Sequence, residues 1–186
     1  APGYTMNDRV FEALAELGVR YDSSVFPCPA YYAIKVGAIA QYRMRGRPTH
    51  SVIDDPRVLR APAEPYRIGR PYFRRGPGLW ELPIGVTRDA FGRLPYIGTS
   101  VLASRRVARL LTAAIAGRSL VNLELHGLDG LDASDGLASL AGSQLDLRLP
   151  AATKLSHLRA IVLDLRARGY AFVTLDDAVT RLEAHA

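Results

Sequence analysis

The 186 residues are 48% hydrophobic and 23% charged, a composition typical of a globular domain with a substantial apolar core. The formal net charge is +6, but the basic residues are scattered and few aromatics lie among them, so the sequence argues against a nucleic-acid-binding protein. A single cysteine excludes an internal disulfide, and no apolar run approaches the roughly 18 residues of a membrane span.

The chain opens with a predicted helix, a short strand and a second helix. Thr5 or Asn7 can cap the first helix, which has apolar residues at helical spacing and ends near Leu17. Residues 19–22 predict a strand, and residues 31–45 predict the second helix. This alternation is typical of an α/β protein.

Two features between these elements bear on function. The polar cluster Asp22-Ser23-Ser24 follows the strand and is either a helix cap and turn or part of a site at a strand end. Cys28 lies between two prolines and is interpreted as a buried small residue, because no helix N-terminus or histidine lies close to it in the sequence.

Residues 46–78 are rich in proline and show no sustained periodicity. A segment of this length without structure is uncommon in a compact domain, so it is a binding loop or lid, or it hides an element. It contains His50, Asp54 and Asp55, which we interpret as residues of a solvated loop, since a lone histidine and a turn are weak evidence for a metal site.

Residues 79–84 predict a short apolar strand that carries Trp80 and Glu81. A tryptophan beside a carboxylate can line a sugar site, because the ring packs on the apolar face of the sugar, but Trp80 can equally be a core residue. A clear amphipathic helix follows, capped by Thr99 or Ser100 and ending before Gly117.

The most informative stretch is residues 120–132, LVNLELHGLDGLD. Its strict alternation predicts a strand with Val121, Leu123 and Leu125 on one face and Asn122, Glu124 and His126 on the other. His126 stands at the carboxyl end of this strand, where ligands gather in parallel sheets and barrels.

A second long loop, residues 127–150, contains Asp129, Asp132 and Asp135, whose spacing of three residues does not match a calcium loop. A helix over residues 153–168, a strand over residues 171–175 and a last helix from Asp176 complete the chain. We therefore expect one α/β domain over residues 1–186, with the strands at 19–22, 79–84, 119–126 and 171–175 in one largely parallel sheet or partial barrel.

Five segments, in order, resemble the polysaccharide deacetylase (NodB homology) family. They are APGY at residues 1–4, YDSSVF at 21–26, LWELPIG at 79–85, LELHG at 123–127 with the following LD, and GYAFVTLDDAV at 169–179. The resemblance implies a distorted (β/α) barrel and a metal-dependent hydrolase that removes acetyl or other acyl groups from amino sugars or polysaccharides.

The resemblance also implies roles for single residues. His126 would be the general acid, Leu125 would line the acyl pocket, Gly3 would offer its backbone N–H to the oxyanion, and Trp80 would form a wall. The family more often has an aromatic residue where Gly3 stands, and its last motif often reads His-Asp where this chain has His126-Gly127.

The family's Asp-Asp pair and His-x-x-x-His motif, which lie on its first strands and hold a divalent metal such as zinc, have no counterpart at the matching positions of this sequence. We therefore expect an incomplete barrel, the C-terminal portion of such a domain, with the N-terminal strands absent and an open sheet edge. A missing N-terminal segment of the same domain would be its partner, and the chain alone would hold no metal and not catalyse.

The sequence leaves other functions open. The runner-up is a non-catalytic carbohydrate-binding barrel of the same ancestry, and a third is an unrelated α/β domain whose long loops contact other proteins. We expect an acylated amino sugar as substrate and a cytoplasmic location, because neither a signal peptide nor a transmembrane segment is evident.

Overall fold

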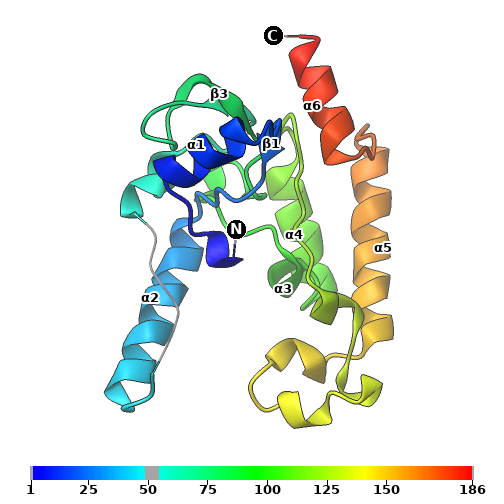
Figure 1. Ribbon diagram of the computed structural model, residues 1–186. Helices are drawn as coiled ribbons and strands as arrows, with labels where there is room; N and C mark the ends of the chain where they lie inside the picture. The colour runs from blue at the N-terminus through cyan, green and yellow to red at the C-terminus, as the bar shows by residue number, and fades with distance from the viewer. Residues whose placement is uncertain (1, 49–54, 186) are drawn as a thin grey trace.

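The computed structural model describes residues 2–48 and 55–185, and it places a small sheet at one end of the molecule with long helices leading away from it (Figure 1). None of the helices within these ranges is both long enough and apolar enough to cross a bilayer. In the described residues the helices are α1 (Asp8–Glu16), α2 (Pro29–Met44), α3 (Gly98–Val101), α4 (Arg105–Ile115), α5 (Ala151–Ala167) and α6 (Leu175–Glu183), and the strands are β1 (Tyr21–Asp22), β2 (Tyr66–Ile68) and β3 (Arg75–Glu81).

The sheet has the order β1-β3-β2. Strand β1 pairs parallel with β3, which aligns Asp22 with Glu81, whereas β2 pairs antiparallel with β3. The β2–β3 hairpin lies largely inside the segment for which the sequence predicted no element, so the alternative of a missed element is the correct one. Its strands approach closely because Gly76 stands beside Gly69, where a Cβ on Gly76 would lie 2.4 Å from the Gly69 Cα.

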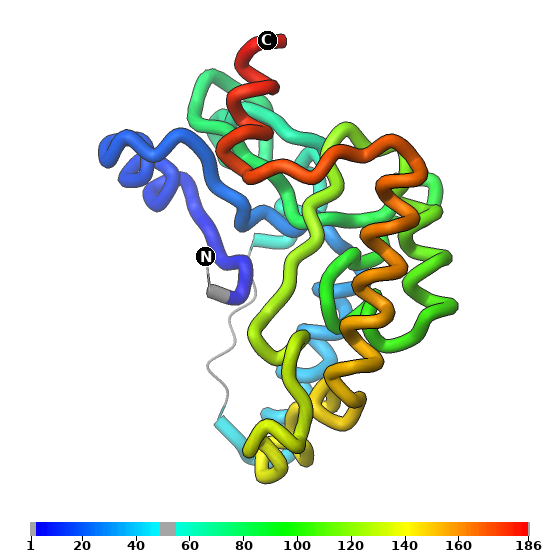
Figure 2. The backbone as a smooth tube through the Cα atoms, turned by 90° about the vertical axis from the view of Figure 1, so that its right-hand side faces the viewer, coloured from blue at the N-terminus to red at the C-terminus, as the bar shows by residue number. Residues whose placement is uncertain are grey.

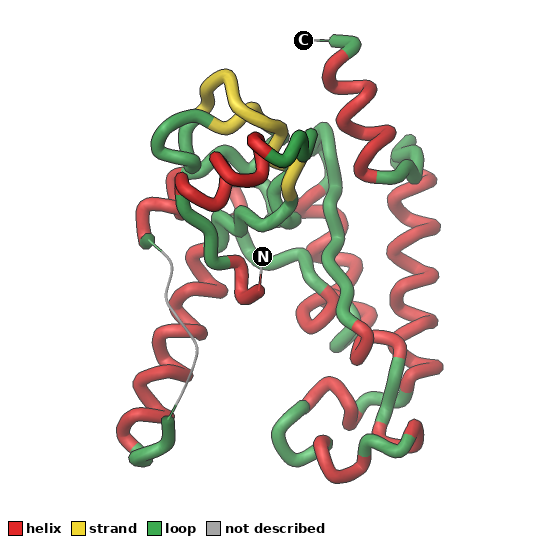
Figure 3. The backbone as a smooth tube through the Cα atoms, viewed as in Figure 1, coloured by secondary structure: helices red, strands yellow, loops and turns green. Residues whose placement is uncertain are grey.

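Two of the four predicted strands form no ladder and are coloured as loop in Figure 3. Residues 119–126 are attached to the sheet side by two backbone bonds, from the Gly85 N–H to the Asn122 carbonyl (2.8 Å) and from the Gly98 N–H to the Glu124 carbonyl (2.9 Å). Residues 171–174 form a connection between α5 and α6. The described residues do not close into a barrel, and the (β/α) barrel stays a prediction.

A groove separates these two segments where a continuous sheet would pair them. The central groove is bounded by residues 119–125 and 169–175 and by the apolar side chains Leu158, Ile161 and Leu165 of α5, and its volume is about 1110 Å³. No backbone hydrogen bond joins the two segments, both of which are fully described. Figure 2 shows residues 119–126 running beside α5.

The helices match the predictions more closely than the strands do. Asn7 caps α1, and its side chain accepts a hydrogen bond from the Val10 N–H. Helix α5 ends before Gly169, whose φ of +89° is the left-handed conformation of a helix C-terminus. The helix predicted from residue 99 is divided into α3 and α4, and the Leu102 carbonyl at the division meets His157 Nδ1 at 2.7 Å.

Residues 127–150 fold as short 3-10 turns around a buried lysine. The Lys154 ammonium donates to the backbone carbonyls of Leu128 (2.6 Å), Leu131 and Asp146 (3.2 Å), and only 2% of Lys154 is exposed. One cation thus satisfies carbonyls from two turns of the loop, and the loop depends on it for its shape.

We predict that Lys154→Met lowers the free energy of unfolding by about 2–3 kcal/mol, because it removes the donor from partly buried carbonyls. Urea denaturation measures this change, and amide exchange should rise selectively in residues 128–147. The other lysine of the sequence provides the control: Lys35 donates to one carbonyl, that of Gly3, at the surface, so Lys35→Met should change stability by less than about 0.5 kcal/mol. Equal losses in the two variants would contradict a special role for Lys154.

Candidate functional site

The polar face of residues 119–126 is held against the ends of β1 and β3. The Asn122 side-chain amide donates to Ser23 Oγ (2.8 Å) and to the backbone carbonyls of Leu82 (3.0 Å) and Pro83 (3.3 Å). Side chains alternate along the segment as predicted, so Glu124 lies on the same face and Leu123 faces the core. The segment therefore presents a polar row although it lacks strand partners along most of its length.

Glu124 is oriented by Tyr4. The Tyr4 hydroxyl donates to Glu124 Oε2 over a distance of 120 residues in sequence, and the Tyr4 ring packs edge-on against Phe26 and Tyr31. Burial and the neighbouring Glu124 carboxylate raise the pKa of Tyr4 far above its usual value, so the phenol stays protonated and remains a donor. One oxygen of Glu124 is thus occupied, and the other, Oε1, is turned toward His126.

His126 is at the open end of this row. Its side chain is 59% exposed, with Nε2 3.7 Å from Glu124 Oε1 and Nδ1 4.0 Å from Asp129 Oδ2. The His126 backbone N–H donates to Asp129 Oδ2 at 2.6 Å, which anchors the turn that follows. The imidazole therefore stands between two carboxylates and is reachable from solvent, which is not the setting of a core histidine.

Gly98 makes room for Asp129. A Cβ at position 98 would lie 2.2 Å from Asp129 Oδ2, so only glycine lets this carboxylate sit against the start of α3. Asp129 is 93% buried in this position, with 7% exposure, and it holds the His126 backbone in place.

The structure brings together some of the residues expected at the site and separates others. Gly3 directly precedes Tyr4 and therefore lies next to the Tyr4–Glu124 contact. Its φ of +63° is in the left-handed region that favours glycine. Leu125 lines the central groove, on the side of the segment away from Glu124. Trp80 packs in a cluster with Leu82 and Val179, and Arg67 stacks on its ring at 5.2 Å, so it occupies the core position that the sequence left open.

A pair of carboxyl groups, of which one is fully buried, lies next to this row and was not predicted. Asp22 and Glu81 face each other across the parallel pairing of β1 and β3, and Glu81 is fully buried. Glu81 Oε1 accepts from the Val25 N–H (2.9 Å) and the Ser24 N–H (3.2 Å), whereas Glu81 Oε2 and Asp22 Oδ2 are buried without a donor. A proton shared between these two oxygens would satisfy both.

Burial and the Asp22 charge together raise the pKa of Glu81 well above its usual value, and a hydrogen bond between the two carboxyls acts in the same direction. The nearby Tyr66 has its pKa raised too, by burial first and then by Glu81. The sequence signals for this pair were the polar cluster that begins at Asp22 and the carboxylate of Glu81 within a predicted strand. No feature of the sequence near either residue indicated that the two meet.

Other polar residues singled out from the sequence have structural roles. Cys28 is buried, as the sequence predicted, although it caps α2 and a helix N-terminus therefore does lie next to it. Burial raises the pKa of its thiol, which disfavours a nucleophilic thiolate. Asp55 pairs with Arg57 in an exposed turn, and Asp132 caps a 3-10 turn. His50 and Asp54 lie outside the described residues.

No group of three or more histidine, cysteine, aspartate or glutamate side chains that could hold a metal occurs in residues 2–48 and 55–185. Glu124, His126 and Asp129 are side chains of the types that bind metals, but their mutual distances are those of ion pairs. The donor set in the described ranges therefore does not fit a catalytic zinc, which takes about three protein ligands.

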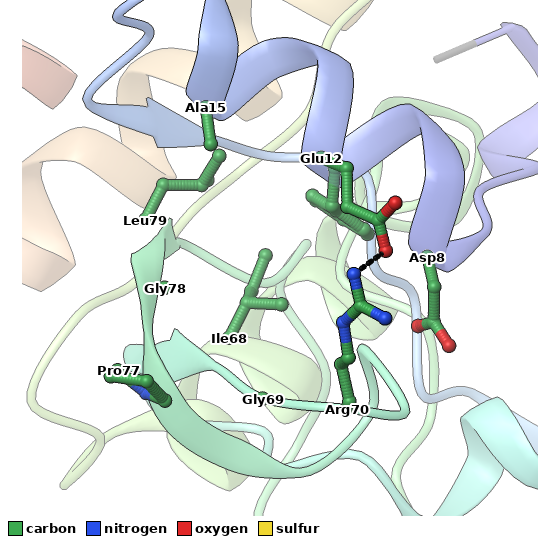
Figure 4. Close-up of a pocket in the computed structure, with 10 residues that line it drawn as sticks. Asp8, Glu12, Ala15, Ile68, Gly69, Arg70, Pro77, Gly78 and Leu79 are labelled. Atoms are coloured by element: carbon green, nitrogen blue, oxygen red, sulfur yellow. Dashed lines mark ion pairs between the residues drawn. The ribbon is translucent and has the colours of Figure 1, made fainter.

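A separate hollow of about 370 Å³ lies between α1 and the β2–β3 hairpin (Figure 4). Phe11, Ile68 and Leu79 line it, and Arg70 and Glu12 form an ion pair across it. None of the residues predicted for the site takes part in it, and we assign it no role.

Comparison with known proteins adds no family to this picture: no family model, curated protein or solved structure matches the chain.

The Asp22–Glu81 pair predicts an unusual pH dependence of stability. The folded-state pKa of Glu81 is above its unfolded value, so its contribution to stability is complete below about pH 4.5 and is lost as pH rises toward the folded pKa. Each pH unit within that window costs the wild type up to about 1.4 kcal/mol. Glu81→Gln keeps an acceptor for the Val25 N–H and offers a permanent donor to Asp22, so its stability should vary less between pH 5 and pH 8.

Urea denaturation at both pH values measures the difference. Glu16→Gln, on the exposed surface of α1, is the control and should follow the wild type. If the wild type and Glu81→Gln show parallel stability curves, Glu81 does not titrate in this window and no proton is shared.

Proposed function

We propose that this chain contributes the general acid of a hydrolase that removes acetyl or other acyl groups from an amino sugar or polysaccharide. The observation that carries the proposal is the exposed His126 imidazole, which stands between two carboxylates at the end of an ordered polar row. The order of the segments that resemble the polysaccharide deacetylase family supports the same reaction.

The chemistry requires such a group. Cleavage of an amide C–N bond releases an amine, and the departing nitrogen needs a proton because an amide anion is a very poor leaving group. A protonated His126 can supply that proton from its exposed ring edge. Glu124 and Asp129 flank the ring at ion-pair distances, and the Tyr4 hydroxyl fixes the orientation of Glu124.

The role of the surrounding residues follows from their positions. Gly3 lies beside Tyr4, whose hydroxyl bonds Glu124, and would offer its N–H to the developing oxyanion. Leu125 and Trp80 belong to the groove and the core, so the proposal does not depend on them. We propose a cytoplasmic location for this activity.

The family that the chain resembles uses a divalent metal to activate the attacking water. Because the described residues do not offer the ligands for one, we derive no step through a metal and assign this chain the acid role alone. The alternative, a non-catalytic carbohydrate-binding protein, keeps the same polar row as a recognition surface without proton transfer.

We predict that His126→Ala lowers the turnover of an N-acetylated amino sugar by about 10²- to 10⁴-fold in the full natural protein, the usual range for a positioned general acid. The fold should be preserved, because the side chain is mostly exposed. Turnover and thermal melting are measured together. Tyr4→Phe, which removes only the hydroxyl that orients Glu124, should give a smaller loss, of roughly tenfold.

His157→Ala is the control for a structural histidine, because His157 is buried and contacts the Leu102 carbonyl. It should lower the melting temperature more than His126→Ala does. Full activity in His126→Ala, or a loss explained entirely by melting, would remove His126 from the reaction, and sugar binding that survives this change would then favour the carbohydrate-binding alternative.

We also predict that the 186-residue chain, purified alone, retains less than about one tenth of an equivalent of zinc after washing with a chelator, since tight zinc sites take about three or four protein ligands. Elemental analysis of the washed protein measures this. Stoichiometric zinc would reveal a ligand set beyond the one described.

A further inference from the structure

A cationic groove on the outer side of helices α4 and α5 is separate from the site around His126. It has a volume of about 650 Å³ and is lined by four arginines, Arg105, Arg106, Arg109 and Arg168, against one carboxylate, Asp164. Figures 1 and 2 show the two helices side by side. Arg168 already pairs with Asp164 at 3.1 Å, whereas the three arginines of α4 form no ion pair with any residue that the structure describes.

These three arginines do not serve the fold. They lie in the first turns of α4, where the helix dipole disfavours cations, and Arg105 and Arg109 are like charges at i,i+4 spacing. Ser104, the N-cap residue, makes no side-chain bond to the helix, and the first turn of α4 contains no acidic residue. Helix α4 packs on the hydrophobic core through its opposite face, with Ala108, Leu111 and Ile115.

An apolar side chain projects from the middle of the same stripe. Leu110 is 71% exposed, and helical geometry places it next to Arg106 and Ala113. An exposed leucine within a row of arginines is the pattern of a helix that lies on a membrane, with the cations at the lipid headgroups and the apolar side chain among the acyl chains.

We propose that the outer face of α4, with Arg105, Arg106, Arg109 and Leu110, docks on the surface of an anionic phospholipid bilayer. Charge complementarity selects an anionic partner, and Leu110 favours a bilayer, whose acyl chains take up an apolar side chain, over a nucleic acid, which would be bound mainly through the arginines. This binding is independent of the acid role of His126 and would bring the protein to substrates held at a membrane.

Flotation with phosphatidylcholine vesicles that contain roughly one third phosphatidylglycerol tests the proposal, since anionic headgroups are what the arginines would bind. The protein should float with these vesicles and not with pure phosphatidylcholine. The triple variant R105E/R106E/R109E should partition at least about tenfold more weakly, given the contribution of each arginine near an anionic surface.

The chain offers matched controls. R43E/R45E/R47E makes the same change in net charge at exposed residues at the end of α2 and should retain most of the binding. Leu110→Ser should weaken binding to anionic vesicles by roughly threefold or more, since it removes the inserted apolar area. Ile34→Ser on α2, where Ile34 is 70% exposed, should have no effect.

Circular dichroism establishes that each variant is folded. Equal losses in the two triple variants would mean that net charge alone drives adsorption, and this would overturn the proposal, as would the absence of flotation. If duplex DNA displaces the vesicles, and its own binding needs the α4 arginines but not Leu110, the surface belongs to a nucleic acid and the proposal is overturned.

Discussion

The side-chain amide of Asn122 is the contact on which the arrangement of this molecule depends. It donates to Ser23 at the end of β1 and to the Leu82 carbonyl just after β3, and the Asn122 backbone carbonyl accepts from the Gly85 N–H. These bonds fix residues 119–126 against the sheet although no ladder forms there. Glu124 can then meet Tyr4, and His126 is directed to the surface between its two carboxylates.

The charges are distributed in two different ways. Arg118 shows the first: Glu64, Asp89 and two backbone carbonyls hold its guanidinium. Along α4 the arginines have no ion-pair partner in the described part of the chain. The hydrogen-bonded network around Arg118 stabilises the fold, whereas the unpaired arginines of α4 do not. The two sets of arginines therefore serve different purposes.

Local signals in the sequence were sufficient to predict the helices and the two faces of residues 121–126. Asn7 and Gly169 mark helix ends through interactions within a few residues, and the alternation of residues 121–126 depends only on extended backbone. The sequence could not show that residues 119–126 pair with no neighbouring strand, because strand pairing depends on segments that are distant in the sequence. The Asp22–Glu81 pair was missed for the same reason, and the β2–β3 hairpin was hidden by glycines and prolines that usually indicate a loop.

The central groove has a consequence for the behaviour of the protein in concentrated solution. Residues 119–125 and 170–174 are extended on either side of it, and neither offers its backbone groups to the other. Natural sheets protect such edges with charges or bulges, but seven leucines and three valines are among the residues that line this groove. The two segments thus leave backbone groups unpaired beside apolar side chains, a combination that favours association with an extended segment of a second molecule at high concentration.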